Sequence, residues 1–273
     1  MSASPALDDL IVLARRLADA AAAVTLPRFR APDLATDDKG VGSLFDPVTA
    51  ADRDAESAIR AILARERPDD AILGEEHAAQ AGRSGFTWVI DPIDGTRAFI
   101  SGLPVWGTLI ALDDGARGVI GIVDQPFTGE RFIGLHDAAG PRAMLEHRGM
   151  VRRIATRQGH ALSDAIAFTT APELFAPAEQ AGFEAIRRRA RLMRYGTDCY
   201  AYALLALGHV DLVVEAGLKA YDIAAPKALI EAAGGIVTDW RGGECRWGGR
   251  VLATAHPALH AEALAHLDAA LSG

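Results

Sequence analysis

Cysteine is scarce in this sequence, with two residues among 273. Cys199 and Cys245 lie far apart, and neither takes part in a CxxC or Cys/His spacing. This scarcity excludes a disulfide framework and a thiolate zinc site as the basis of the fold, and it is typical of proteins from reducing compartments. We therefore expect two free thiols and a cytoplasmic protein.

Long apolar runs and dense basic clusters are also missing. No stretch approaches the roughly 18 apolar residues of a membrane span, and Asp8 and Asp9 stand where a signal peptide would carry positive charge. Lys and Arg number 28 against 36 Asp and Glu, a formal net charge of −8 at pH 7. No basic run is dense enough to follow a nucleic-acid backbone. Neither nucleic acid nor a membrane is therefore an expected partner.

Apolar residues, by contrast, are abundant enough for a large core, since they make up half of the chain. A chain of this length forms one large domain or two joined ones. No linker rich in Ser, Gly or Pro and no internal repeat divides it. We predict a single domain made of two subdomains, roughly 1–145 and 146–273.

Apolar periodicity predicts the order of the elements. An opening helix begins behind Ser4 and Pro5, and a second helix begins at Thr49 with Asp52 closing a capping box. Short apolar runs then predict a largely antiparallel sheet in the middle of the chain, from strands near 71–73, 88–90, 108–112, 118–123 and 131–135. Farther on, strands near 166–170, 210–214 and 236–238 alternate with helices near 177–182, 198–207, 224–233 and 256–271. This alternation predicts a second layered half.

The most informative stretch is WVIDPIDGT at residues 88–96. An apolar run ends at Asp91, Pro92 is expected to stop strand pairing, and Asp94 begins a segment with the composition of a helix start. Two carboxylates are thus predicted at the end of one strand.

Further acids follow other elements. Glu75 and Glu76 come after the apolar run that ends at Gly74, and Asp222 stands at a predicted helix start after the strand that ends near Glu215. Converging carboxylates repel one another unless a cation lies between them, and an all-oxygen set suits Mg²⁺ or Mn²⁺. The sequence therefore predicts an acidic metal site.

Each acid also has a purely structural interpretation. Asp94 and Asp222 could be helix N-caps, Asp52 could serve only its capping box, and Glu75 could be an exposed turn residue. Their joint placement favours a site, because a buried carboxylate is costly without a partner.

These residues resemble the motifs of the inositol monophosphatase superfamily of metal-dependent phosphatases. The similar segments are 74–76 (GEE), 91–96 (DPIDGT), 222–225 (DIAA) and 232–236 (AAGGI), in order within residues 39–249. The resemblance implies an α/β fold in α-β-α-β-α layers, a homodimer, and a site with two or three Mg²⁺ ions, Mn²⁺ being possible.

The resemblance also implies individual roles. It assigns the metal ligands to Glu75, Asp91, the carbonyl oxygen of Ile93, Asp94 and Asp222. Asp52 and Thr96, with Glu75, would activate the attacking water, and the N–H groups of Gly95 and Thr96 would hold phosphate. Lys39 and Asp46 resemble a mobile loop that completes the site.

Within the superfamily, the sequence is most similar to the histidinol-phosphate phosphatase subgroup. The similar segments are 96–104 (TRAFISGLP), 106–108 (WGT), 124–126 (DQP) and 194–202 (RYGTDCYAY). Asp198 and Glu215 fall where the family contacts the alcohol, and they could pair with the cationic end of histidinol phosphate. Arg97 is a further substrate-binding candidate. The alternatives are a surface ion pair for Arg97 and a helix N-cap for Asp198.

The resemblance thus implies Mg²⁺-dependent hydrolysis of L-histidinol phosphate to L-histidinol and phosphate, in histidine biosynthesis. Two alternatives stay open: the same chemistry on inositol 1-phosphate or another small ester, and a non-catalytic role in binding a partner protein. His256 and His260 lack the intervening glutamate of a zinc protease, and we expect them to face solvent.

Overall fold

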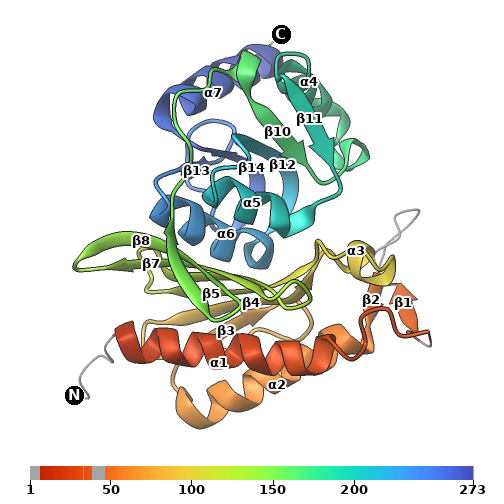
Figure 1. Ribbon diagram of the computed structural model, residues 1–273, viewed down its shortest axis with the longest axis vertical. Coiled ribbons are helices and arrows are strands. Elements are labelled where there is room, and N and C mark those ends of the chain that lie inside the picture. Colours follow the sequence, from red (N-terminus) through yellow and green to blue (C-terminus); the bar gives the residue numbers. More distant parts are fainter. Residues whose placement is uncertain (1–6, 33, 39–46, 273) are drawn as a thin grey trace.

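A computed structural model describes residues 7–32, 34–38 and 47–272 of the chain. Helices and sheets stack in the α-β-α-β-α order that the resemblance implies (Figure 1). From the bottom of that view, the layers are α1 with α2, a seven-stranded sheet, α5 with α6, a five-stranded sheet, and α4 with α7. Ser4, Pro5, Lys39 and Asp46 lie outside the described residues.

The first helical layer consists of α1 (Leu7–Thr25) and α2 (Ala50–Glu66). The buried stripe of α1, which includes Leu10, Ala14 and Leu17, packs with α2 on one face of the larger sheet. A short hairpin of β1 (Thr36–Asp38) and β2 (Pro47–Thr49) precedes α2. The predicted capping box at the start of α2, between Thr49 and Asp52, is confirmed.

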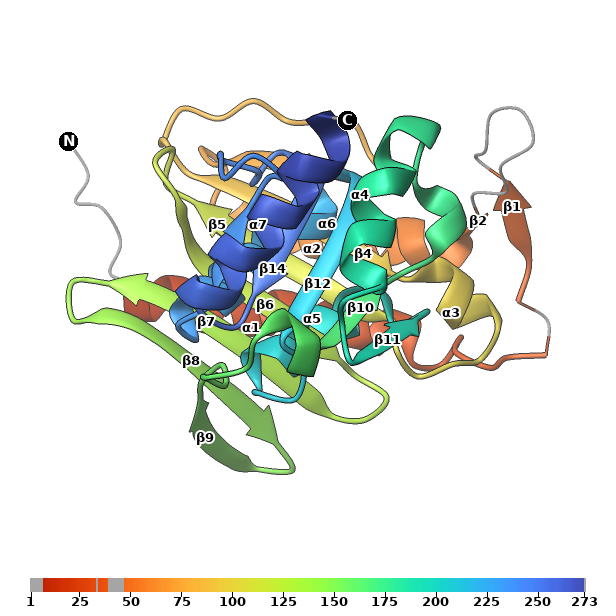
Figure 2. The same ribbon diagram turned by 90° about the horizontal axis from the view of Figure 1, so that it is seen from above.

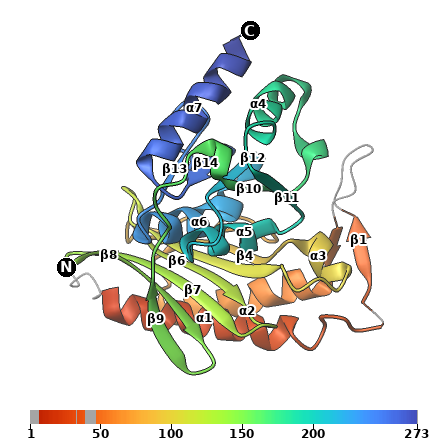
Figure 3. The same ribbon diagram turned by 45° about the horizontal axis from the view of Figure 1, so that its top comes forward.

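The larger sheet follows chain order from β3 to β9, and every neighbouring pair is antiparallel except β3 with β4. Its strands are β3 (Ala71–Gly74), β4 (Thr87–Asp94), β5 (Gly107–Asp113), β6 (Gly118–Gln125), β7 (Glu130–Asp137), β8 (Gly140–His147) and β9 (Met150–Ile154). The predicted antiparallel sheet is thus confirmed, but β8 and β9 were not predicted. Figure 3 shows their hairpin at the edge of the sheet, where most residues of β9 are exposed and form no apolar run.

The smaller sheet has the strand order β11-β10-β12-β14-β13 and mixes parallel with antiparallel pairs. Its strands are β10 (Ile166–Thr169), β11 (Leu192–Tyr195), β12 (Leu212–Lys219), β13 (Ile236–Thr238) and β14 (Gly248–Thr254). The helices around it are α4 (Pro177–Arg187), α5 (Asp198–Ala206), α6 (Ala220–Ala232) and α7 (Pro257–Ser272), and Figure 2 shows α4 and α7 over its outer face. The strands β11 and β14 were not predicted.

Helix α6 lies between the two sheets, and two glycines let it approach the larger one closely. A Cβ at Gly121 would lie 2.4 Å from the carbonyl oxygen of Ala225, and one at Gly134 would lie 2.5 Å from Cα of Leu229. Helix and sheet are therefore in backbone contact. This contact sets the position of α6, whose first turn carries Asp222.

The prediction that Pro92 stops strand pairing is wrong. β4 continues to Asp94, with a register shift between Asp91, which pairs with Leu109, and Asp94, which pairs with Gly107. Pro92 sits in this bulge, where the ladder requires no N–H donor. The strand that was predicted to end near Glu215, β12, likewise continues to Lys219 across a bulge.

The prediction that His256 and His260 face solvent is also wrong, since both are 6% exposed. The His260 ring lies between the hydroxyls of Thr254 and Thr238, at 2.9 Å from each. His256 accepts the N–H of Leu259 at 3.2 Å in the first turn of α7. Both histidines are thus interior polar residues whose hydrogen bonds offset their burial.

The chain passes from one sheet to the other between Ile154 and Ile166. The larger sheet thus extends somewhat past residue 145, and the division into two subdomains stays a prediction. Among the described helices, none combines the length and apolarity needed to span a bilayer.

Candidate active site

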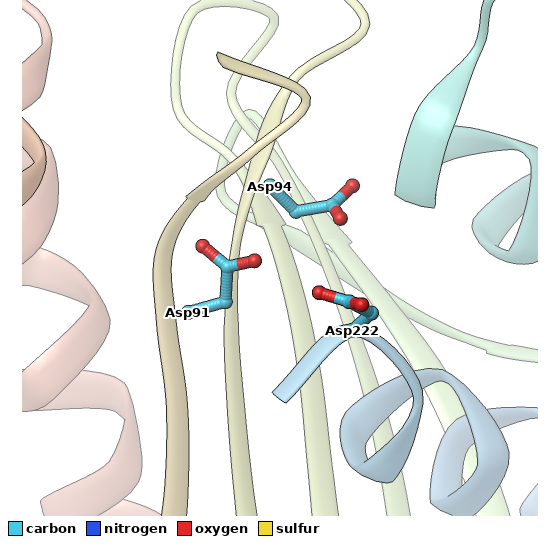
Figure 4. Close-up of side chains that lie close together, drawn as sticks. All are labelled: Asp91, Asp94 and Asp222. Carbon is cyan, nitrogen blue, oxygen red and sulfur yellow. The ribbon is translucent and has the colours of Figure 1, made fainter. Parts of the chain in front are cut away.

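Three aspartates converge where β4 ends and α6 begins (Figure 4). One carboxylate oxygen from each of Asp91, Asp94 and Asp222 lies within 4.8 Å of the others. Residues three positions apart on a regular strand point to opposite faces. The bulge between Asp91 and Asp94 adds one residue, so both carboxylates reach the same side.

Backbone N–H groups hold the three carboxylates. Asp91 accepts from Ile93 at 3.0 Å. Asp94 accepts from Cys199 at 2.7 Å, across 105 positions of chain. Asp222 accepts from Lys219 at 2.6 Å.

The interpretation of Asp94 and Asp222 as N-caps of their own helices is wrong. Gly95 occupies the N-cap position of α3 (Thr96–Ile100), and Lys219 occupies that of α6, where Asp222 closes a capping box from within the first turn. Asp94 instead binds the first turn of α5, which belongs to the other half of the chain. Each carboxylate is thus oriented by the backbone while one oxygen faces the cluster.

Electrostatic repulsion within the cluster is strong. Burial raises the pKa of Asp91 well above its ordinary value, and the charges of Glu75, Asp94 and Asp222 add to the shift. Burial and the charges of Asp198 and Asp222 likewise raise the pKa of Asp94, although the hydrogen bonds from Cys199 oppose this. Such a group must bind protons or a cation. Because all the donors are oxygens, a hard divalent cation fits them.

The cluster opens into a cavity of about 210 Å³. Its described lining residues are Glu75, Asp91, Ile93, Asp94, Gly95, Thr96, Arg97, Thr170, Leu174, Asp198 and Asp222. The structure therefore brings together, from both halves of the chain, most of the residues that the sequence predicted for the site. Lys39 and Asp46, predicted as a mobile loop, lie outside the described residues.

Thr96 lines this cavity, and Asp52 lies behind it, outside the described lining residues. One carboxylate oxygen of the buried Asp52 accepts from the N–H of Thr49 at 2.8 Å and from its hydroxyl at 2.6 Å. The other oxygen lies 3.3 Å from the Thr96 hydroxyl, which also lies 3.1 Å from the carbonyl oxygen of Ile93. Asp52 thus closes its capping box and contacts Thr96 at the same time.

Asp198 lines the same cavity and lies beside Gly95. A Cβ at Gly95 would lie 3.0 Å from the Asp198 side chain. Burial raises the pKa of Asp198 to about 6, and the positive charge of Arg97 opposes that shift. Asp198 is the first residue of α5 and has a left-handed φ of 43°, while Thr197 holds the N-cap position. The alternative role of Asp198 as N-cap is therefore wrong.

Glu215 lies behind the cavity and is not among its described lining residues. One of its oxygens accepts from the N–H of Thr170 at 2.7 Å and from the Thr170 hydroxyl at 3.0 Å, and the other accepts from Thr169 at 3.2 Å. Burial raises the pKa of Glu215 to about 7 despite these bonds. Glu215 therefore reaches the cavity through Thr170.

Comparison with known proteins identifies the family to which this chain belongs. The profile of the inositol monophosphatase family matches residues 6–272. The chain belongs to this family. Its members are metal-dependent. As a member of this family, the chain is a phosphoric monoester hydrolase that acts on small phosphate esters.

Individual relatives have several names. The chain is 41% identical to the bifunctional phosphatase IMPL2 of Arabidopsis thaliana, over 88% of this chain and 67% of that protein. It is 37% identical to a histidinol-phosphatase of Streptomyces coelicolor, over 96% and 97% of the two chains. A solved inositol monophosphatase of Zymomonas mobilis superposes with a TM-score of 0.84 at 45% identity, over 97% of this chain and all of that one. Other relatives are named inositol-1-monophosphatase and Nus factor SuhB.

The sequence did not predict that Thr170 and Leu174 line the cavity, nor that Cys199 holds Asp94. Thr170 directly follows β10, so it carries the same signal, a polar residue at a strand end, that identified Asp91. Leu174 ends a short 3₁₀ turn (Pro172–Leu174) and has no such signal. Cys199 contributes its backbone N–H, which any residue type except proline would supply.

Proposed function

We propose that the protein is a Mg²⁺-dependent phosphomonoesterase that hydrolyses L-histidinol phosphate to L-histidinol and phosphate. The observation that carries this choice is the presence of a further acid, Asp198, in the same cavity as the aspartate cluster. The proposed substrate has an anionic phosphate and a cationic amine. An acid that is not one of the proposed cation ligands can pair with this amine. Inositol phosphates have no positive charge.

In this proposal the cations are held by Glu75, Asp91, Asp94, Asp222 and the carbonyl oxygen of Ile93. Two or three Mg²⁺ ions are expected, with Mn²⁺ as a possible replacement. When bound, such ions neutralise the charge of the phosphate and activate water at neutral pH. The N–H groups of Gly95 and Thr96 would orient the phosphate oxygens.

The Thr96 hydroxyl has one proton and two acceptors within reach, the carboxylate of Asp52 and the carbonyl oxygen of Ile93. A cation held by the Ile93 carbonyl oxygen would leave Asp52 as the better acceptor for the Thr96 proton. Thr49 keeps Asp52 oriented for this bond. The oxygen of Thr96 then has a lone pair free for a proton of the attacking water, so the two residues act as a relay.

At the alcohol end, we propose that Asp198 contacts the amine directly and that Arg97 lines the same wall. Glu215 would act through Thr170, whose N–H and hydroxyl it holds. We keep the homodimer and the loop with Lys39 and Asp46 as parts of this proposal, on the family resemblance alone.

The test is phosphate release by the purified protein from histidinol phosphate, inositol 1-phosphate and an uncharged aryl phosphate. We expect kcat/KM for histidinol phosphate to exceed that for inositol 1-phosphate by about tenfold or more. EDTA should abolish hydrolysis and added Mg²⁺ should restore it.

The relative named inositol-1-monophosphatase and the Zymomonas mobilis inositol monophosphatase support inositol 1-phosphate as the second candidate. A higher kcat/KM for inositol 1-phosphate would select that candidate. Hydrolysis that persists in EDTA would overturn the proposed cation site.

A further inference from the structure

Glu56 is a buried acid beside the site that the chemistry above does not use. It lies on α2, one turn after Asp52, and its side chain is fully buried. One carboxylate oxygen accepts from Nε of Arg60 at 2.7 Å, and the other accepts from the backbone N–H of Glu76 at 2.7 Å. The carboxylate therefore joins its own helix to the turn that follows β3.

That turn carries Glu75 between two hydrogen-bonded N–H groups. The N–H of Glu75 donates to the carbonyl oxygen of Ile90 on β4 at 3.2 Å, and the next N–H, of Glu76, donates to Glu56. Arg60 also donates to the carbonyl oxygen of His77 at 3.3 Å. The backbone on both sides of the Glu75 side chain is thus held, while that side chain lines the cavity.

Gly74 shows how closely Glu56 fits under this turn. A Cβ at residue 74 would lie 2.0 Å from a carboxylate oxygen of Glu56. The space that a side chain at this position would need is therefore occupied by the carboxylate. This contact accounts for glycine immediately before the glutamate pair.

We infer that Glu56, paired with Arg60, is a positioning residue that fixes the 74–77 turn so that Glu75 faces the cation site. Residues that orient a ligand in this way typically change metal affinity about 10–100-fold when mutated. The pairing with Arg60 offsets the cost of burying the carboxylate. This inference rests on the proposed cation site but not on the identity of the alcohol.

The test is Mn²⁺ binding to the purified full-length chain without substrate, with free Mn²⁺ measured by electron paramagnetic resonance. Glu56→Gln keeps the shape but replaces one acceptor with an NH₂ donor, which must face either Arg60 or the N–H of Glu76. We expect this variant to raise the Kd for Mn²⁺ about tenfold. In activity assays, the Mg²⁺ concentration that gives half-maximal activity should rise by a similar factor, and excess Mg²⁺ should restore kcat.

Asp70→Asn is the matched control. Asp70 is also buried, pairs with Arg67 at 2.7 Å, and accepts from the Trp88 indole at 2.9 Å, at the end of β3 away from Glu75. The Asp70→Asn variant should lower the midpoint of thermal unfolding about as much as Glu56→Gln does, and it should leave the Kd for Mn²⁺ unchanged.

Wild-type Mn²⁺ affinity in a destabilised Glu56→Gln variant would show a merely structural role and overturn the inference. If Glu56→Gln does not fold, Gly74→Ala is measured instead, because it displaces the same carboxylate, and an unchanged Kd there has the same meaning. A wild-type chain that binds no Mn²⁺ would overturn the proposed cation site itself, an outcome distinct from failure of the positioning role alone.

Discussion

The backbone N–H of Cys199 donates to the carboxylate of Asp94 at 2.7 Å and thereby joins the first turn of α5 to the end of β4. The thiol of Cys199 lies close enough to the same carboxylate to interact with its charge. Burial and the charge of Asp94 raise the pKa of this thiol well above its ordinary value, so it stays protonated. A donor from one half of the chain thus orients an acid of the other half.

Cys199→Ala removes the thiol and leaves the backbone N–H in place. We expect the Kd for Mn²⁺ to rise by about tenfold at most, because the polar thiol beside Asp94 is lost while the backbone hydrogen bond to Asp94 is kept. Cys199→Ser should recover part of the affinity, since a hydroxyl is also polar. Calorimetric titration of the three proteins with Mn²⁺ measures this, and equal affinities would show that the thiol has no orienting role.

Asp198→Asn tests the alcohol end of the cavity. Asparagine tolerates the left-handed φ of 43° at this position, so the variant should fold. Removing the charge should raise KM for histidinol phosphate by about tenfold, the value of one charge-assisted hydrogen bond, and change KM for an uncharged aryl phosphate little. Steady-state kinetics on both esters decide the matter. Equal losses on the two would contradict a contact with the amine.

His260 should make folding stability depend on pH. Burial, assisted by the charge of Lys227, lowers its pKa from an ordinary 6.5 to about 4. The folded state therefore favours the neutral ring, and the stability it contributes is present above pH 6.5 and lost as the pH falls toward 4. We expect a loss of about 2 kcal/mol in unfolding free energy between pH 7.5 and pH 5 from this residue.

His260→Gln supplies the comparison, because other groups titrate in the same range. Urea unfolding at both pH values should show a smaller pH dependence for the variant. The same dependence in both proteins would mean that His260 titrates normally in the folded state.

Gly121→Ala tests the backbone contact between α6 and the larger sheet. The new Cβ would lie 2.4 Å from the carbonyl oxygen of Ala225, so helix or strand must move. We expect a loss of about 1–3 kcal/mol in unfolding free energy, together with weaker Mn²⁺ binding because α6 carries Asp222.

Gly129→Ala is the control for this variant. Its position has a φ of 74° and no neighbouring atom within 4 Å, so only backbone strain contributes. It should cost about 1 kcal/mol and leave Mn²⁺ binding unchanged. Wild-type stability in Gly121→Ala would contradict the close approach of α6.

The sequence alone was sufficient for the features that depend on local pattern. Apolar runs that end in Gly, Pro or Asp predicted the strands around Glu75 and Asp91, and the spacing of Thr49 and Asp52 predicted the capping box of α2. The three acidic motifs were also sufficient to recognise the family resemblance, because each motif is contiguous in the chain. Lone acids such as Asp198 and Glu215 could be proposed only through the resemblance.

Tertiary structure decided the rest. The bulge that lets β4 pass Pro92 depends on how β5 pairs with it. The burial of His260 depends on the position of α7 beside β13 and β14, whose threonine hydroxyls contact its ring. Whether Glu215 lines the cavity or lies behind Thr170 depends on how β10 pairs with β12. These outcomes arise from contacts between segments distant in the chain. A local pattern contains the chemistry of each partner but not the geometry that brings the partners together.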